Sequence, residues 1–175
     1  KQMKLQKSLD AFLFCCYAGM RYSDFTNLSK KNIVDINQET WLIYKSVKTG
    51  TEVRLPLYLL FAGKGIVILN KYRNNLEDFF RLRDNSNINK DLIIIAKLAG
   101  LSKKISFHTA RHTNATLLIY NGVNITTVQK LLGHKSVKTT QVYTNIMDMT
   151  IVHDLEKIKQ AALGIKKKTD NSFNK

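Results

Sequence analysis

A histidine and a tyrosine in the segment 131–144 are spaced in a way that suits chemistry on a phosphodiester. His134 follows a Leu-Gly pair, and Tyr143 lies nine residues later, behind a Thr-Thr pair. Two further runs carry residues of the same kind: His-Thr-Ala-Arg-His at 108–112, and Ala-Gly-Met-Arg-Tyr-Ser-Asp around Arg21. Two arginines, several histidines and a tyrosine are the groups needed to break a DNA phosphodiester without a metal ion.

Each role in such a cleavage has a candidate residue. Attack on phosphorus requires a nucleophile, an acid for the leaving oxygen, and positive charge on the non-bridging oxygens. Arginine suits the last role because its planar fork makes two parallel hydrogen bonds to phosphate and stays charged at any relevant pH. Arg21 and Arg111 can each bind one side of the phosphate. Tyr143 is the candidate nucleophile, because a tyrosine ester conserves the energy of the broken bond for later rejoining. The alternative is core packing, which is the more common role of a tyrosine considered alone.

His108 and Arg111 are expected to share one face of a helix. They lie three residues apart, with His112 one position further along, so one face can contact one phosphate. Two other interpretations are a partly buried helix start with a capping histidine, and a zinc pair formed by His108 and His112. Zinc is disfavoured because the run has no Glu in the position of an HExxH motif and because Arg111 would repel a cation.

Lys48 opens a Lys-Thr-Gly-Thr run that predicts a turn between two strands. A lysine at such a hairpin tip can serve as the acid for the leaving oxygen. The alternative is a lysine that is merely exposed to solvent, in which case Lys45, three residues earlier, is the rival.

The elements that must position these groups indicate an α+β protein that is mostly α. A helix over residues 6–17 shows apolar side chains at helical spacing and ends at Gly19, which places Arg21 at a break between helices. Aromatic and β-branched runs predict a small three-stranded antiparallel sheet with Lys48 at a hairpin tip. The strands are expected at residues 33–36, 41–47 and 52–55.

The remainder is helical by pattern, and an Asn- and Ser-rich loop is expected at 84–89. Ser136 can cap a last short helix that carries Tyr143. The other helices are expected at residues 24–28, 57–62, 65–72, 76–83, 90–99, 108–120 and 125–132.

Composition points to a polyanionic partner. The 175 residues hold 28 Lys and Arg against 13 Asp and Glu, a net charge of +15 with a pI near 9.9. Nucleic acid is the leading candidate for this partner. Binding to a membrane surface would require the basic residues to line one amphipathic helix, whereas here they are spread along the chain. No apolar run has membrane-spanning length, no signal-peptide pattern opens the chain, and the adjacent Cys15 and Cys16 are expected to be free thiols. A reducing, cytoplasmic setting fits.

These motifs strongly resemble the catalytic domain of the tyrosine recombinases, the phage-integrase family. The resemblance runs from about Lys7 to Met147 and is densest from His108 to Tyr143. Its motifs are an arginine after a helix, a β-hairpin lysine, His-x-x-Arg, a Leu-Gly-His turn, and a tyrosine nine residues later. Ala110 stands where the family most often has leucine, and residue 145 is Asn where a histidine is common.

The resemblance implies a role for each candidate residue. Arg21 and Arg111 would bind the scissile phosphate, and His108 would act as the general base or its orienting partner. Asp24 resembles the acidic residue that steadies the region of the first arginine.

The remaining three carry the other steps. Lys48 would protonate the departing 5′ oxygen, His134 would hydrogen-bond a phosphate oxygen, and Tyr143 would form a 3′-phosphotyrosine. The resemblance implies a site-specific recombinase or integrase that needs no metal, cofactor or ATP. It would act on double-stranded DNA as a homotetramer and be monomeric in isolation. Neither a membrane nor a small-molecule substrate is expected, and the setting would be a prokaryotic cell, at the nucleoid.

Two alternatives remain: a type IB topoisomerase-like relaxing enzyme, and a non-catalytic DNA-binding module. We expect the catalytic domain at 1–148 and, at 149–175, a C-terminal helix followed by a basic, disordered tail. The N-terminal core-binding domain that the family usually carries is expected to be absent from this fragment. An apolar stripe, Ile151, Leu155, Ile158 and Ala162, can dock either on its own domain or on a neighbouring protomer.

Overall fold

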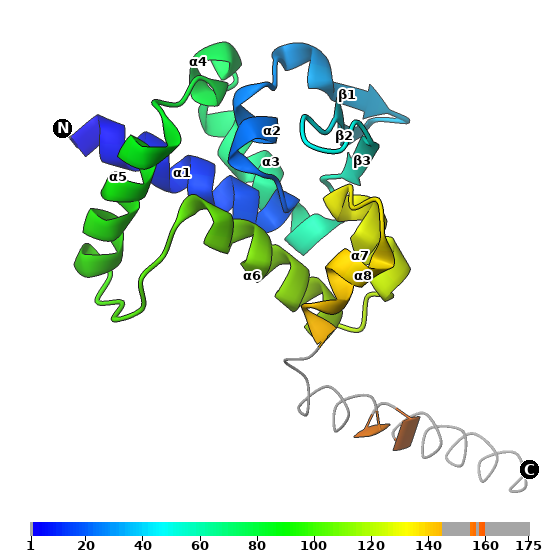
Figure 1. Ribbon diagram of the computed structural model, residues 1–175. Coiled ribbons are helices and arrows are strands. Elements are labelled where there is room, and N and C mark those ends of the chain that lie inside the picture. Colours follow the sequence, from blue (N-terminus) through cyan, green and yellow to red (C-terminus); the bar gives the residue numbers. More distant parts are fainter. Residues whose placement is uncertain (1, 145–154, 157, 160–175) are drawn as a thin grey trace, which may run out of the picture.

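The computed structural model describes residues 2–144, 155, 156, 158 and 159. Helices make up most of this part of the chain, and one small sheet lies at the side (Figure 1). The elements in chain order are α1 (Gln2–Ala18), α2 (Tyr22–Thr26), η1 (Lys30–Asn32), β1 (Ile33–Ile36), β2 (Glu39–Lys45), β3 (Glu52–Pro56), η2 (Leu60–Gly63), α3 (Lys64–Lys71), α4 (Leu76–Phe80), α5 (Asn85–Leu98), α6 (Phe107–Tyr120), α7 (Ile125–Leu132) and α8 (Val137–Gln141).

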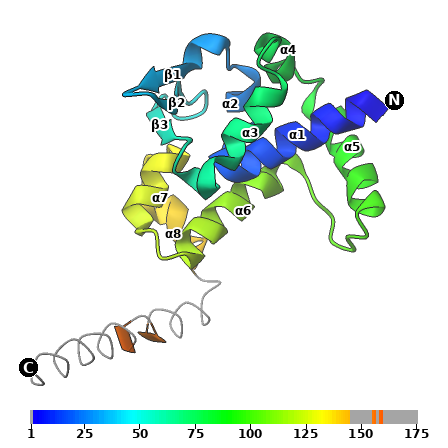
Figure 2. The ribbon, with the colours of Figure 1, turned by 180° about the vertical axis from the view of Figure 1, so that it is seen from behind.

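Helix α1 is the central element, and it packs against α6, α3 and α5. Both views show it crossing the middle of the molecule with α6 beside it (Figures 1 and 2). Its buried side includes Phe14, whose ring makes edge contacts with Phe25 and Phe79 at centroid distances of 5.9 and 6.3 Å. Phe25 also meets Phe107, at the start of α6, at 6.1 Å. This aromatic cluster joins the two halves of the chain into one core.

The sheet is three-stranded and antiparallel in the order β1-β2-β3, as predicted. Leu42 pairs with Leu55 and Tyr44 with Val53, and all four side chains are buried. Residues that alternate along a strand share a face, so this face of the hairpin covers the core while the other meets solvent.

The largest departures from the expected local structure are at residues 84–89 and 57–62, and smaller ones are the strand expected at 41–47, which ends at Lys45, and the helix expected at 76–83, which ends at Phe80. Residues 84–89 were expected to form a loop, but Asp84 caps α5 by accepting a 3.0 Å hydrogen bond from the backbone N–H of Asn87, and Ile88 is buried. Capping by the polar residues and burial of one apolar side chain outweigh their weak helix propensity. Residues 57–62 were expected to be helical, yet they form a turn and a short 3₁₀ segment with Phe61 and Ala62 at positive φ.

The C-terminal helix expected within residues 149–175 lies mostly outside the described residues, as do Asn145 and the predicted tail. Four positions, 155, 156, 158 and 159, are described and helical. In the described part of the chain, no helix is long and apolar enough to cross a membrane. Cys15 and Cys16 are buried thiols without a disulfide, as expected.

Candidate active site

Arg21 is positioned by a tight junction between α1 and α2. Gly19 ends α1 with φ +67°, and a Cβ there would lie 2.6 Å from Oδ1 of Asn114 on α6. The Asn114 amide donates to the carbonyl oxygens of Cys16 and Tyr17 at 3.0 and 2.9 Å. Only glycine fits both the backbone angle and the space, so α6 holds the end of α1 and Arg21 starts α2 as its N-cap residue.

Asp24 connects Arg21 to the β-hairpin. The Arg21 guanidinium lies 3.5 Å from Oδ2 of Asp24 and donates to Oγ of Ser46 at 3.2 Å. The buried Asp24 carboxylate also accepts from the backbone N–H of Val47 at 2.8 Å and from the Ser46 hydroxyl at 3.3 Å. The expected steadying role of Asp24 thus has a physical form: one carboxylate orients the arginine and fixes the start of the turn that carries Lys48.

Arg111 is the most deeply buried cation of the candidate set, with 1% of its surface exposed. It donates to the carbonyl oxygen of Gly19 at 2.7 Å and to that of Leu132 at 2.6 Å. No ion pair within the described residues includes it. Burial, followed by the charge of Arg21, lowers the pKa of Arg111 to about 10. A buried cation without a carboxylate partner favours binding of an anion.

The hairpin tip packs on the end of α7. Thr49, next to Lys48, donates to the carbonyl oxygen of Gly133 at 3.0 Å. Gly133 has φ +61°, and a Cβ there would lie 2.6 Å from Cγ2 of Val53. The close approach places the turn of Lys48 beside the residue that precedes His134.

Lys48 and Lys45 are both exposed, but they differ in the groups around them. The charge of Lys48 is among those that lower the pKa values of His108 and His134. Lys45 lies at the end of β2, opposite Glu52. The charge of Lys48 therefore acts on both candidate histidines.

His134 is held in place through its backbone and its ring. Its N–H donates to Gln129 O at 3.0 Å, and the Gln129 amide donates back to His134 O at 3.1 Å. Nδ1 of the ring lies 2.9 Å from Oγ1 of Thr140 on α8. Burial and then the charges of Arg111, Arg21 and Lys48 lower the pKa of His134 to about 4, so the ring is neutral near pH 7.

Tyr143 was expected on the last short helix, but α8 ends at Gln141 and Tyr143 lies two residues beyond that end, with 6% of its surface exposed. Its N–H donates to Thr140 O at 3.0 Å, and its ring makes an edge contact with His112 at a centroid distance of 5.3 Å. Burial raises the pKa of the phenol, while the charges of Arg111 and Arg21 oppose that rise. The candidate nucleophile thus lies in the field of both arginines.

His112 was given no role by the sequence beyond the disfavoured zinc pair. In the structure it lies between two candidates, with ring contacts to His108 at 4.5 Å and to Tyr143 at 5.3 Å. The four-residue helical spacing of His108 and His112 was the signal that could have found the first contact. Within the described residues, no three metal-binding side chains gather around this pair.

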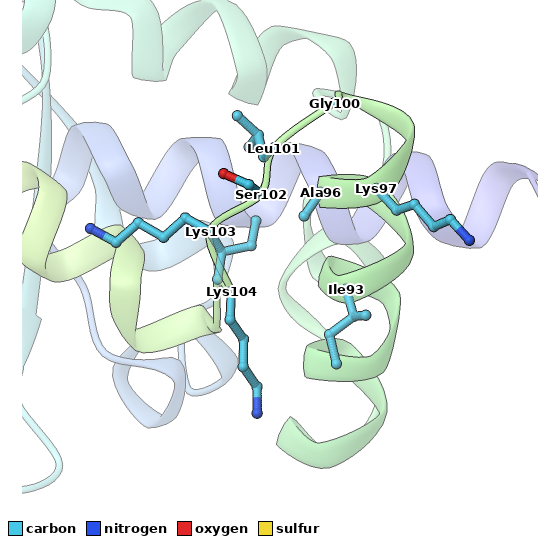
Figure 3. A pocket seen from close by; sticks show the side chains of 9 residues that line it. Ile93, Ala96, Lys97, Gly100, Leu101, Ser102, Lys103 and Lys104 are labelled. Carbon is cyan, nitrogen blue, oxygen red and sulfur yellow. The ribbon is translucent and has the colours of Figure 1, made fainter.

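A pocket of about 510 Å³ lies away from the six candidate residues (Figure 3). It is bounded by α5 and the segment that follows it, with Ile93, Ala96 and Leu101 among its lining residues. The side chains of Lys97 and Lys103 extend away from it on opposite sides (Figure 3). None of the six candidate residues lines this pocket.

The sequence itself establishes the family. The model of the Phage integrase family matches residues 3–149. The chain belongs to this family. A tyrosine recombinase XerC from Rickettsia prowazekii is 30% identical over 159 residues, covering 86% of this chain and 49% of the relative. XerA from Saccharolobus solfataricus is 34% identical over 134 residues, covering 74% and 42%. This phage-integrase family member therefore spans about half the length of the curated relatives it matches.

Solved structures of the family share the fold. The crystal structure of XerA recombinase superposes with a TM-score of 0.67 at 26% identity, covering 90% of this chain and 63% of that one. A lambda integrase dimer bound to a COC′ core site has a TM-score of 0.63 at 21% identity, covering 81% and 56%. The predicted family and its mostly helical architecture with a small antiparallel sheet are both confirmed.

Proposed function

We propose that this chain cuts and rejoins double-stranded DNA through a covalent 3′-phosphotyrosine, as the catalytic domain of a site-specific recombinase or integrase. The observation that carries the proposal is Arg111, a buried guanidinium without a carboxylate partner among the described residues, whose charge acts on the phenol of Tyr143. A phosphodiester bound there would supply the missing anion and lie beside the nucleophile.

The reaction then uses each candidate once. Arg21 and Arg111 bind the non-bridging oxygens, and the phenolate oxygen of Tyr143 attacks phosphorus. The bond from phosphorus to the 5′ oxygen breaks as the bond to the tyrosine forms. His108 takes the phenol proton or orients the group that does, and Lys48 gives a proton to the 5′ oxygen. Because one ester replaces another, the reverse reaction rejoins the strand without ATP.

His134 would donate a hydrogen bond to a phosphate oxygen as negative charge builds up. Burial, followed by the charges of Arg111, Arg21 and Lys48, lowers the pKa of His134 and keeps its ring neutral in the absence of DNA. In this scheme the fixed positive groups do the work that a divalent ion does in metal-dependent nucleases. We infer no metal and no cofactor.

We propose residues 1–148 as the catalytic domain and a homotetramer on DNA as the working assembly, with the chain alone a monomer. The net charge of +15 supports the DNA partner. In its solved structure, lambda integrase is bound to a core site, and we extend DNA binding to this chain. The expected setting is the prokaryotic cytoplasm.

A suicide substrate tests the function. A nicked duplex that loses its short 5′-OH fragment after cleavage should trap the protein on DNA as an adduct that survives denaturant. Tyr143→Phe should abolish the adduct and leave DNA affinity nearly unchanged, since removal of one hydroxyl changes no charge. Tyr58→Phe, on a half-buried tyrosine beside Trp41, is the matched control and should form the adduct normally. An adduct from the Tyr143→Phe protein would rule out the assignment.

The two alternatives give different results in the same system. A non-catalytic DNA-binding module binds the nicked duplex and forms no adduct. A topoisomerase-like enzyme forms the adduct and relaxes a supercoiled plasmid, but does not exchange strands between two separate, intact sites. The proposal expects such exchange between two duplexes that each carry a complete site.

A further inference from the structure

Thr140 makes a buried hydrogen bond to the ring of His134. Its side chain is 0% exposed, that of His134 is 7% exposed, and Thr140 Oγ1 lies 2.9 Å from Nδ1 of the imidazole. The ring is neutral near pH 7, so it carries one N–H and one bare nitrogen. The position of this proton decides whether the second nitrogen, Nε2, donates or accepts a hydrogen bond.

The surroundings of Thr140 decide which atom donates. A threonine inside a helix commonly gives its hydroxyl hydrogen to the carbonyl four residues earlier, as Thr26 does to Tyr22 O at 3.1 Å. Among the described residues, the hydrogen bond of Thr140 Oγ1 is the one to His134 Nδ1. A fully buried hydroxyl hydrogen requires an acceptor, and Nδ1 of His134 can serve as that acceptor when it carries no proton.

We propose that Thr140 is a positioning residue that fixes His134 as the Nε2–H tautomer, so that the ring presents a donor to the phosphate. This inference rests on the proposed function and deepens it, because a bare Nε2 would repel a phosphate oxygen whereas Nε2–H binds it. Arg111, Arg21 and Lys48 are the charged groups that act on the ring, and all three disfavour a second proton.

The same residue also holds the nucleophile. The backbone carbonyl of Thr140 accepts the N–H of Tyr143 at 3.0 Å, while its hydroxyl contacts His134. One residue therefore couples the position of the tyrosine to the hydrogen-bonding state of the histidine. Thr140 touches neither phosphate nor sugar in this scheme, so its effect on the reaction passes through these two neighbours.

Long-range proton–nitrogen NMR of histidine-labelled protein tests the tautomer directly, at neutral pH and without DNA. The His134 signals are assigned by their absence in His134→Asn. We expect the ring of the unaltered protein and of Thr140→Ser to be Nε2–H, and that of Thr140→Val, which keeps the shape but lacks the hydroxyl, to be a mixture or Nδ1–H. An Nδ1–H ring in the unaltered protein would overturn the proposal.

The suicide substrate supplies the functional readout. Thr140→Val should slow adduct formation about tenfold, the effect of one hydrogen bond, and Thr140→Ser should restore most of the rate. If Thr140→Val slows the reaction only in proportion to lost folded protein while the ring stays Nε2–H, Thr140 merely packs and the proposal fails. The NMR result needs no cleavage, so failure of the proposed function, seen as no adduct from the unaltered protein, is distinguishable from failure of this inference.

Discussion

The guanidinium of Arg111 donates a 2.7 Å hydrogen bond to the carbonyl oxygen of Gly19, two residues before Arg21. A second bond, at 2.6 Å, reaches Leu132, two residues before His134. Arg111 thus fixes the backbone beside two other candidate residues, and no ion pair among the described residues includes it. In the proposed mechanism, stability and catalysis therefore depend on the same side chain.

Arg111→Lys should therefore damage both properties. Lysine keeps the charge but cannot reach two carbonyl oxygens and a phosphate at once. Because one charged hydrogen bond is lost, we expect the free energy of unfolding to fall by about 1.5–3 kcal/mol. Adduct formation should fall about 100-fold or more. The exposed Arg54 on β3 is the matched control, and Arg54→Lys should change neither melting nor cleavage. Normal cleavage by Arg111→Lys would show that the planar fork is not needed.

A substrate with sulfur in place of the leaving 5′ oxygen should identify the acid. Sulfur leaves without a proton, so it should rescue Lys48→Ala far better than Arg111→Ala, whose loss is one of charge. Lys45→Ala is the matched control, because it removes another exposed lysine from the same hairpin. This variant should cleave the ordinary substrate normally. Equal rescue of Lys48→Ala and Arg111→Ala would place the acid elsewhere, and Lys45 would be the next residue to test.

Gly133→Ala should destabilise the contact between the hairpin and α7. Left-handed backbone costs alanine about 1–2 kcal/mol, and the added methyl would also overlap Cγ2 of Val53, for about 1–3 kcal/mol more. Gly100→Ala is the control, because its φ is +69° but nothing lies within 4 Å of the new Cβ. Chemical denaturation measures both. Val53→Ala should restore part of the loss in the Gly133→Ala background, and equal losses at Gly133 and Gly100 would contradict the steric argument.

Cleavage should persist in excess EDTA. The positive charges of Arg21, Arg111 and Lys48 act on one histidine, so charge is supplied to the site without a divalent ion. The suicide substrate with and without chelator is the measurement. Loss of adduct on chelation, with recovery on addition of zinc or magnesium, would contradict a metal-independent reaction.

Deletion after residue 148 should impair assembly more than folding. It removes Leu155 and Ile158, which are 61% and 66% exposed and so contribute little to the core of their own domain. We expect melting and DNA affinity to be kept, with loss of cooperative binding and of ordered pairwise cleavage. The full-length variant Leu155→Asp with Ile158→Asp should behave in the same way. A truncated protein that melts much lower, with cooperativity per folded molecule unchanged, would show that the segment covers its own domain.

The sequence alone predicted what depends on neighbours along the chain. The strand over residues 33–36 and the helix over 125–132 have the bounds expected, because side-chain periodicity and the signals at Asn124 and Gly133 act within a few residues. The Thr-Gly turn placed Lys48 at a hairpin tip for the same reason. The order and spacing of the motifs also indicated the family before any contact was known.

Only the tertiary structure decided how these residues meet. Arg111 and Gly19 are 92 positions apart, and no local pattern predicts that a buried guanidinium will find that carbonyl. The partners of His134 and Tyr143, namely Thr140 and His112, were likewise absent from the predicted site. Such contacts form when packing excludes water, because each buried polar group then needs a hydrogen-bond partner. That partner can come from anywhere in the chain, so periodicity along the sequence does not predict it.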